Sequence, residues 1–356
     1  MPFLRNTWYV GAWSADVATE TLVARTILGE PIVFARTASG EVTALYDRCP
    51  HRFAALSRGH VSGEAVVCGY HGLQYDATGA CIRNPHGNKT IPPGAIVRRF
   101  PTVEKHSLVW IWMGAETPRP AEIPDFRILD EAQPKFVSKR DYIVMKANYA
   151  IITDNLLDLS HVNILHEGLL GNEQANEAAI DLDVQDDTVT VRRFSENVPV
   201  PKLFDLTFRQ DGKPVDTWTE MRWNQPGCML LDAGVTEPGA GKAAGTSVIG
   251  IHLLTPETET STHYHFAAVR VNPPQRSAEE ELAIRDEVSK YRRFIFESQD
   301  EPMIELQQQR ILQAHDNPRP ALLGIDAGPV RAQRILREHI DREAREPQLA
   351  TANGER

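Results

Sequence analysis

Two short motifs in the first quarter of the chain each combine a cysteine with a histidine. Cys49-Pro50-His51 is followed, after residues 52–67, by Cys68-Gly69-Tyr70-His71. Two thiolates and two imidazoles suit either tetrahedral zinc or a [2Fe-2S] cluster in which two histidines replace two cysteines on one iron. Because each motif supplies one residue of each kind, the thiolates can take one iron and the imidazoles the other. The pattern therefore favours the iron-sulfur cluster, with zinc as the alternative.

A second group of potential ligands lies in the segment Asn148–His166, which reads NYAIITDNLLDLSHVNILH. We expect one helix over about residues 150–166, in which Asp158 and His161 share a face. His161 and His166 are five residues apart, about 140° around a regular helix, so both can bind one metal only if the helix widens or ends near them.

Two histidines and one carboxylate leave positions open on a metal, an arrangement typical of non-haem Fe(II) and oxygen activation. We expect Asp300, beside the helix break at Pro302, as the third ligand rather than Glu297 or Glu301. On their own, His161 and His166 could equally be structural. The cysteine motifs favour a metal-binding role, because an iron-sulfur cluster that relays electrons needs an acceptor, and an iron that holds O2 is a suitable one.

The chain divides into four segments. Apolar runs separated by Gly, Pro, Asn and Asp predict an all-β domain over residues 1–115, with strands at Pro31–Ala35, Val42–Tyr46, Ala65–Cys68 and Ser107–Met113. Four prolines make residues 116–134 a linker without a regular helix. Residues 135–345 mix helices with strands at 188–194, 249–255 and 262–271, and residues 346–356 form a flexible tail. The fold class is α+β, with an antiparallel rather than a doubly wound sheet.

Two helices close the second domain. The first runs from Ser277 to about Leu312, where Ser277 and Glu280 form a capping box and Pro302 kinks or restarts the helix. The second runs from Pro329 to about Arg345.

Composition excludes several classes of protein. The chain has 356 residues, 38 Lys plus Arg against 48 Asp plus Glu, and a formal charge of −10, so nucleic acid is not an expected partner. No apolar run is long enough to span a membrane, and the N-terminus lacks a secretory signal. Four cysteines are too few for a disulfide scaffold, so we expect a cytoplasmic protein in which Cys81 and Cys228 are buried thiols and His60 and His86 are ordinary loop histidines.

Both motif groups, in this order, resemble the Rieske non-haem iron oxygenases, and the resemblance covers essentially the whole chain. The likeness is greatest to the oxygenase components of the vanillate O-demethylase and dicamba monooxygenase group. It is carried by NTWYV from Asn6, CPHRFAALSRG from Cys49, CGYHGLQYD from Cys68, VWIWMG from Val109, DNLLDLSH from Asp154 and LLTPETETSTHY from Leu253. The resemblance implies a Rieske domain followed by a helix-grip catalytic domain, in a head-to-tail homotrimer.

The resemblance also implies roles for individual residues. Cys49, His51, Cys68 and His71 would hold the cluster, and His161, His166 and Asp300 the iron. Asp158 would link His71 of one subunit to His161 of the next, with Asn155 near the iron. His252 would face the substrate, with a core histidine as an equal alternative. Tyr291 and Asp232 are weaker candidates, because an aromatic on an apolar helical stripe is usually core and an acid would repel a carboxylate substrate.

The sequence thus predicts the terminal oxygenase of a multicomponent system. A separate reductase or ferredoxin would deliver electrons from NAD(P)H, because the chain has no Gly-rich nucleotide-binding motif. The expected substrate is a small methoxylated aromatic acid, O-demethylated with O2 and release of formaldehyde. Ring or side-chain hydroxylation and N-demethylation are alternatives at the same iron. From another class, a Rieske-type electron carrier or a zinc-stabilised ligand-binding protein would need the first motif pair but not the second group.

Overall fold

The computed structural model describes residues 3–315 and 320–345, which form two compact units. The first unit comprises residues 3–125, 255–259 and 340–345, and the second comprises residues 126–254, 260–315 and 320–339. The expected flexible tail at 346–356 lies outside the described residues. None of the described helices combines the length and the apolar character that a membrane crossing requires.

The first unit is built from antiparallel strands in three sheets, ordered β1-β11-β10, β2-β3-β4-β9 and β5-β6-β7-β8. The strands are β1 (Trp8–Trp13), β2 (Leu22–Ile27), β3 (Glu30–Arg36), β4 (Val42–Tyr46), β5 (His60–Ser62), β6 (Ala65–Val67), β7 (Gln74–Asp76), β8 (Cys81–Arg83), β9 (Arg99–Phe100), β10 (Thr102–Lys105) and β11 (Leu108–Trp112). The predicted all-β character of this region is confirmed. Strand β11 is buried at every position, as its continuous apolar run indicates.

The second unit contains a seven-stranded antiparallel sheet in the order β12-β18-β17-β16-β15-β14-β13. Its strands are β12 (Asp141–Met145), β13 (Ile180–Gln185), β14 (Thr188–Val198), β15 (Val215–Asn224), β16 (Cys228–Thr236), β17 (Thr246–Thr258, whose end belongs to the first unit) and β18 (Ser261–Val271). The predicted α+β class with an antiparallel sheet is confirmed.

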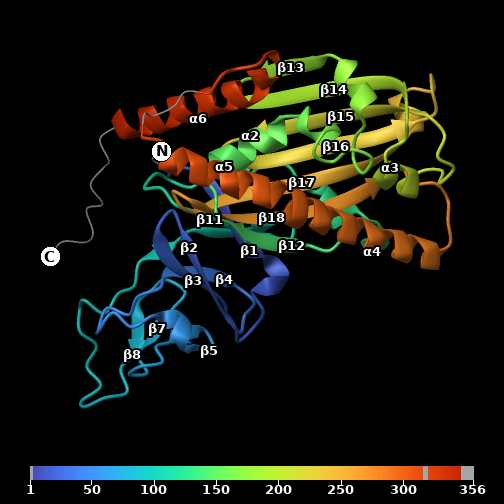
Figure 1. Ribbon diagram of the computed structural model, residues 1–356. Coiled ribbons are helices and arrows are strands. Elements are labelled where there is room, and N and C mark those ends of the chain that lie inside the picture. Colours follow the sequence, from blue (N-terminus) through green and yellow to red (C-terminus); the bar gives the residue numbers. More distant parts are fainter. Residues whose placement is uncertain (1–2, 316–319, 346–356) are drawn as a thin grey trace. The chain divides into compact units, whose positions relative to one another are not determined.

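Helices cover one face of this sheet: α2, α4, α5 and α6 lie on the same side of it in Figure 1. The helices are α1 (Ile128–Glu131), α2 (Tyr149–Leu157), α3 (Lys202–Thr207), α4 (Ala278–Phe294), α5 (Glu301–Gln313) and α6 (Ala327–Arg345). Short 3₁₀ turns are η1 (Ser14–Asp16), η2 (Leu56–Arg58), η3 (Pro120–Glu122), η4 (Pro134–Phe136), η5 (His161–Asn163), η6 (Glu173–Glu177), η7 (Lys242–Ala244) and η9 (Gly324–Asp326). The proline-rich segment contains one helical turn, α1, which was not expected.

The long helical segment formed by α4 and α5 has a break that matters for the site. It begins at the predicted capping box, where the Ser277 side chain accepts from the Glu280 N–H at 3.2 Å. Between α4 and α5 the chain forms a π-helical turn, Ile295–Asp300. Pro302 explains the break, because its ring excludes the carbonyl of Ser298 from a regular helical position and it has no N–H to donate.

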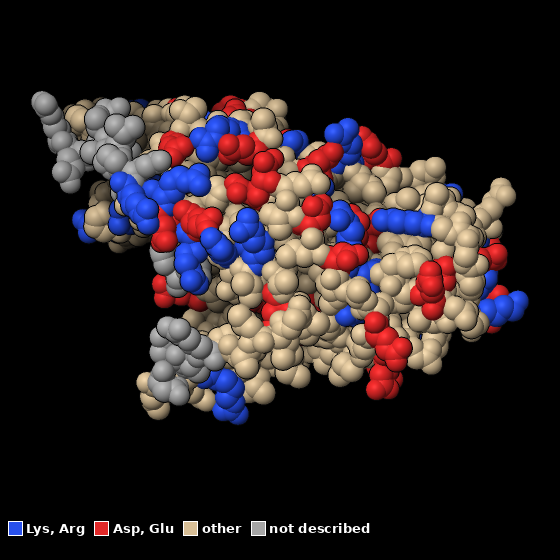
Figure 2. All heavy atoms as spheres, turned by 90° about the horizontal axis from the view of Figure 1, so that it is seen from above, with Lys and Arg blue, Asp and Glu red and all other residues tan. Residues whose placement is uncertain are grey.

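Charges are mixed on the face drawn in Figure 2, where Lys and Arg side chains alternate with Asp and Glu. On α6, for example, Arg334 pairs with Glu338 at 2.9 Å. This face therefore carries no extended basic stripe of the kind that tracks nucleic-acid phosphates.

Candidate metal sites

The two cysteine–histidine motifs form loops with the same backbone hydrogen bonds. In residues 49–54 and in residues 68–73, the cysteine N–H donates to the carbonyl five residues later at 2.8 Å, and the residue four after the cysteine donates to its carbonyl at 2.9 Å. That fourth residue has a positive φ in both loops, 58° at Phe53 and 69° at Gly72. The two loops therefore present their side chains from matching frameworks.

The thiols lie inside and the imidazoles lie outside. Cys49 and Cys68 are buried, whereas His51 is exposed and His71 is half-buried. The centres of the two imidazole rings are 4.5 Å apart. This separation of thiols from imidazoles agrees with the sequence-based interpretation, in which each iron takes one pair of like ligands.

Two glycines let the loops approach each other closely. A Cβ atom at Gly59 would overlap the Val67 carbonyl, and one at Gly69 would overlap the Arg58 carbonyl. Neither position could carry a larger residue without moving a loop.

Two residues that sequence reasoning did not single out adjoin this site. The buried Tyr75 hydroxyl lies 3.2 Å from Cys49 Sγ. His86, expected to be an ordinary loop histidine, places its Nε2 2.8 Å from the carbonyl oxygen of His71. Tyr75 stands in the strand that follows the second motif, so the alternation of that strand could have indicated an inward-facing hydroxyl.

In the second unit, the prediction of one helix over about residues 150–166 is wrong. Helix α2 begins after its N-cap, Asn148, whose side chain accepts from the Ala150 N–H at 2.9 Å, and it ends at Leu157. Asp158 is the C-cap in an extended conformation, so it does not share a helix face with His161.

A local hydrogen bond explains why the helix stops. The Asp158 side chain accepts from the Ser160 N–H at 2.7 Å, which replaces a helical bond with a turn. The buried Arg193 holds the turn by donating to the Leu159 carbonyl at 3.2 Å and to the Ser160 hydroxyl at 3.0 Å. His161 then lies in a 3₁₀ turn rather than in the α-helix.

This early end brings three potential ligands together. Asp300 Oδ1 lies 3.2 Å from His166 Nε2 and 3.7 Å from His161 Nε2. The ligand atoms of the three residues all lie within 4.8 Å of one another, with His166 and Asp300 buried. Asn155, on α2, donates to Asp300 Oδ1 at 3.3 Å.

The outer nitrogens of both rings are engaged elsewhere. His161 Nδ1 lies 2.5 Å from the Asp158 carbonyl oxygen, and His166 Nδ1 lies 2.9 Å from Gln299 Oε1. Each histidine therefore turns Nε2 towards Asp300. Burial lowers the pKa of His161, and His166 acts in the same direction while Asp300 opposes it. A neutral imidazole is the form that binds a metal.

The Asp158 carboxylate does not make the expected hydrogen bond to His161. Its Oδ2 is 3.9 Å from His161 Nδ1, too far for a hydrogen bond, and the backbone carbonyl of the same residue takes that place. Asp158 thus contacts His161 through its main chain.

His252 is buried in an aromatic environment. Its Nδ1 lies 2.6 Å from the Tyr264 hydroxyl, and the ring centre of Phe296, a residue of the π-helical turn, is 5.6 Å away. Burial lowers the pKa of His252 to about 3, so the ring is neutral. Its Nε2 has no hydrogen-bond partner among the described residues.

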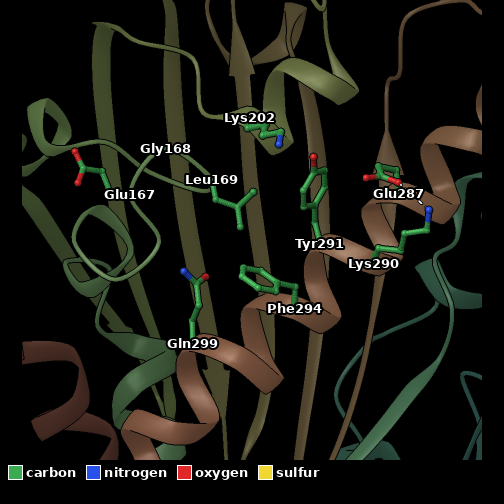
Figure 3. A pocket seen from close by; sticks show the side chains of 9 residues that line it. All are labelled: Glu167, Gly168, Leu169, Lys202, Glu287, Lys290, Tyr291, Phe294 and Gln299. Atoms are coloured by element: carbon green, nitrogen blue, oxygen red, sulfur yellow. Dashed lines mark hydrogen bonds and ion pairs between the residues drawn. The ribbon is translucent and has the colours of Figure 1, made fainter.

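Tyr291 lines a pocket of about 550 Å³ in the second unit. Figure 3 shows Tyr291 and Phe294 extending into this pocket from α4, and Gln299 from the π-helical turn that follows it. Leu169 and Lys202 line the pocket opposite that helix, and the Lys202 ammonium lies 5.2 Å from the centre of the Tyr291 ring. Gln299, which lines this pocket, also contacts His166, with its Oε1 2.9 Å from His166 Nδ1.

Asp232 is not brought to this group. It pairs with Ile249 across the sheet, three residues from His252 on β17, so the alternation of the strand places Asp232 and His252 on opposite faces. Its carboxylate accepts from Trp218 Nε1 at 3.0 Å and pairs with Lys242 Nζ at 2.6 Å. The concern that Asp232 would repel an anionic substrate therefore disappears.

Comparison with known proteins identifies the family. Residues 7–101 match the Rieske [2Fe-2S] domain, and residues 145–342 match the vanillate O-demethylase oxygenase C-terminal domain. The chain belongs to the vanillate O-demethylase type of Rieske oxygenases.

Relatives cover nearly its whole length. The oxygenase component of chloroacetanilide N-alkylformylase from Rhizorhabdus wittichii is 34% identical over 99% of this chain and 100% of the relative. The oxygenase component of dicamba O-demethylase from Stenotrophomonas maltophilia is 33% identical over 94% of this chain and 97% of the relative. A crystal structure of dicamba monooxygenase bound to 3,6-dichlorosalicylic acid has a TM-score of 0.87, with 33% identity, 97% of this chain covered and 100% of that chain.

The donor sets present in this Rieske oxygenase fit the cofactors of its family, a [2Fe-2S] cluster and a non-haem iron. Two buried thiols with two outer imidazoles suit the cluster, and two imidazoles with a buried carboxylate suit Fe(II). The remaining cysteines, Cys81 and Cys228, are buried outside both groups, and burial raises the pKa of Cys228 to about 12.

Proposed function

We propose that this oxygenase removes a methyl group from the oxygen of a small aromatic acid. The observation that carries the proposal is the convergence of His161, His166 and Asp300 in a chain whose separate loops pair Cys49 with His51 and Cys68 with His71. An electron-transfer site and an oxygen-activating site in one chain are what an oxidative demethylation requires.

When bound, the cluster supplies electrons singly and the mononuclear iron supplies O2 activation. The balanced reaction takes an aryl methyl ether, O2, two electrons and two protons to the hydroxymethyl ether and water. The hydroxymethyl ether is a hemiacetal, which breaks its C–O bond to give the phenol and formaldehyde.

The protein's own residues hold and orient these groups. In our proposal, Asn155 fixes Asp300 through its 3.3 Å hydrogen bond, and the neutral His252 offers its free Nε2 to a polar group of the substrate. Asp158 contacts His161 through its backbone carbonyl, and its carboxylate side chain is 26% exposed. In our proposal, this carboxylate accepts a hydrogen bond from His71 of a second subunit in a head-to-tail homotrimer, as the family resemblance implies.

The relatives named as oxygenase components support a separate reductase or ferredoxin that takes electrons from NAD(P)H. We propose a cytoplasmic location, where such a nicotinamide-dependent partner and four free cysteines are both expected.

The test is turnover with a surrogate reductase, NADH and a panel of methoxybenzoates. We expect formaldehyde, the phenol and O2 consumption in equal amounts. Consumption of O2 with a hydroxylated product that keeps its methoxy group would overturn the demethylation and favour hydroxylation.

N-dealkylation is the second candidate, because the chloroacetanilide relative, 34% identical to this chain, is named as an N-alkylformylase. Matched N-alkyl and O-methyl substrates in the same assay separate the two reactions. Faster aldehyde release from the N-alkyl compounds would favour this alternative.

A further inference from the structure

Two consecutive residues contact the two nitrogens of one imidazole. Gln299 Oε1 lies 2.9 Å from His166 Nδ1, and Asp300 Oδ1 lies 3.2 Å from His166 Nε2. Both contacts come from the last two residues of the π-helical turn. Gln299 and Asp300 therefore contact the His166 ring at its two nitrogens.

The orientation of the Gln299 amide follows from its other contact. Its Nε2 donates to the Leu165 carbonyl at 3.0 Å, and a carbonyl can only accept. The amide oxygen must then face the ring, so His166 Nδ1 carries the proton and donates to it. The tautomer that remains has its lone pair on Nε2, the nitrogen that faces Asp300.

The π-helical turn makes this arrangement possible. Consecutive side chains of an α-helix point about 100° apart, which separates neighbours around the axis. A π-helical turn holds more residues, so Gln299 and Asp300 lie closer in direction and reach the same ring.

The other histidine obtains its tautomer differently. His161 Nδ1 contacts the Asp158 backbone carbonyl, an acceptor that no substitution removes. The acceptor for His166 is a side chain and can be tested by mutation.

We propose that Gln299 is a positioning residue that fixes the His166 tautomer and so prepares Nε2 as a metal ligand. The inference rests on the proposed iron site at His161, His166 and Asp300. A carboxamide or carboxylate at this position would serve, and an apolar residue would leave both tautomers and the ring rotation free.

The experiment measures metal binding rather than activity. The mononuclear site of the full-length holoprotein is emptied with a mild chelator while the cluster is retained, and Co(II) binding is measured by equilibrium dialysis with metal analysis. We expect Gln299→Leu to weaken Co(II) binding about 10- to 100-fold, the usual effect of removing such an outer contact. Gln299→Glu keeps an acceptor for His166 Nδ1 but loses the donor to the Leu165 carbonyl, so it should weaken binding less than Gln299→Leu does.

Gln309→Leu, at an exposed position on α5, is the matched control and should bind like the wild type. In proton NMR of the Co(II) form, the wild type should give two shifted, exchangeable Nδ1–H signals, and Gln299→Leu should lose one or exchange it faster.

The outcomes separate the two claims. The role of Gln299 alone would be overturned if Gln299→Leu kept the Co(II) affinity and the Nδ1–H signals of the wild type. It would also be overturned if Gln299→Glu lost as much Co(II) affinity as Gln299→Leu. Failure of the wild type to bind Co(II) at all would overturn the iron site, and the role of Gln299 with it.

Discussion

The cluster loops and the iron-ligand group are built in opposite ways. The loops at 49–54 and 68–73 carry all four proposed cluster ligands within 23 consecutive residues, Cys49 to His71, and each loop is closed by its own backbone hydrogen bonds. The iron-ligand group joins a turn after α2 to a residue more than 130 positions later in the chain. A local motif therefore specifies the first site, whereas packing of helices on a sheet assembles the second.

This difference means that the second site depends on supports that the first does not need. Arg193, Asn155 and Gln299 hold its turn, its carboxylate and one of its rings through side-chain hydrogen bonds. The cluster loops obtain the same rigidity from main-chain bonds and from glycines.

The largest expected effect is a clean separation of the two sites. His166→Ala should abolish turnover and leave the visible spectrum of the cluster intact, because the cluster ligands lie in other loops. Cys68→Ala should abolish the cluster spectrum and leave Co(II) binding in the second unit. Visible spectra and metal counts of both variants test whether the two sites are independent. Loss of both sites in either variant would contradict their independence.

Asp158→Asn should slow electron delivery without emptying the iron site. The backbone carbonyl that contacts His161 remains, whereas the charge that we propose contacts a second subunit is lost. We expect the oxidation of pre-reduced cluster by O2 and substrate to slow about 10- to 100-fold in stopped-flow experiments. Asp186→Asn, on the exposed β13–β14 turn, is the control, and equal rates for both variants would exclude the bridge.

The inner face of α2 should make the second unit sensitive to pH. Burial raises the pKa of Asp154 to about 7, with a contribution from the charge of Asp326, while Gln333 donates to its Oδ2 at 2.5 Å and opposes the shift. The folded state then holds the proton more tightly than the unfolded state. The contribution of Asp154 to stability should be largest at low pH and should fall as the pH rises from about 4 to 7.

The corresponding variant is Asp154→Asn, which removes the charge and keeps an acceptor for Gln333. It should be more stable than the wild type at pH 8 by about 4 kcal/mol, and about equally stable near pH 4. Chemical unfolding followed by helical circular dichroism measures this at several pH values. Parallel curves for the two proteins would show that Asp154 is ionised throughout.

The smallest effect concerns the cluster loops. The Tyr75 hydroxyl lies 3.2 Å from Cys49 Sγ. When Cys49 is a thiolate ligand of the cluster the hydroxyl is the donor, and such a bond would stabilise the more negative, reduced cluster. Tyr75→Phe should lower the midpoint potential by roughly 20 to 60 mV, the equivalent of one hydrogen bond for a one-electron couple. Tyr70→Phe, at an exposed ring, is the control, and equal potentials in all three proteins would refute the contact.

The sequence predicted the local features well. Turn residues bounded the strands of the first unit, and the capping box at Ser277 located the start of α4. The spacing of His161 and His166 indicated that a helix must widen or end near them, but not which of these happened. The helix ends, because the Asp158 side chain competes for the Ser160 N–H, and the widened turn lies in the other helix, at Asp300.

Other features required the three-dimensional structure. Gln299 has no motif, and only the π-helical turn places it beside His166. Strand register, which fixes the face of each residue, separates Asp232 from His252 although both lie on neighbouring strands. Such contacts depend on long-range packing that no local pattern encodes.

The central claim is that one chain carries a cluster and a separate mononuclear iron. Anaerobic purification followed by iron, zinc and acid-labile sulfide counts, with visible and EPR spectra of the reduced protein, tests it directly. We predict about three irons and two sulfides per chain and a reduced Rieske signal. Zinc without sulfide would contradict the whole account, and two irons with two sulfides in protein loaded with Fe(II) would reduce it to an electron carrier.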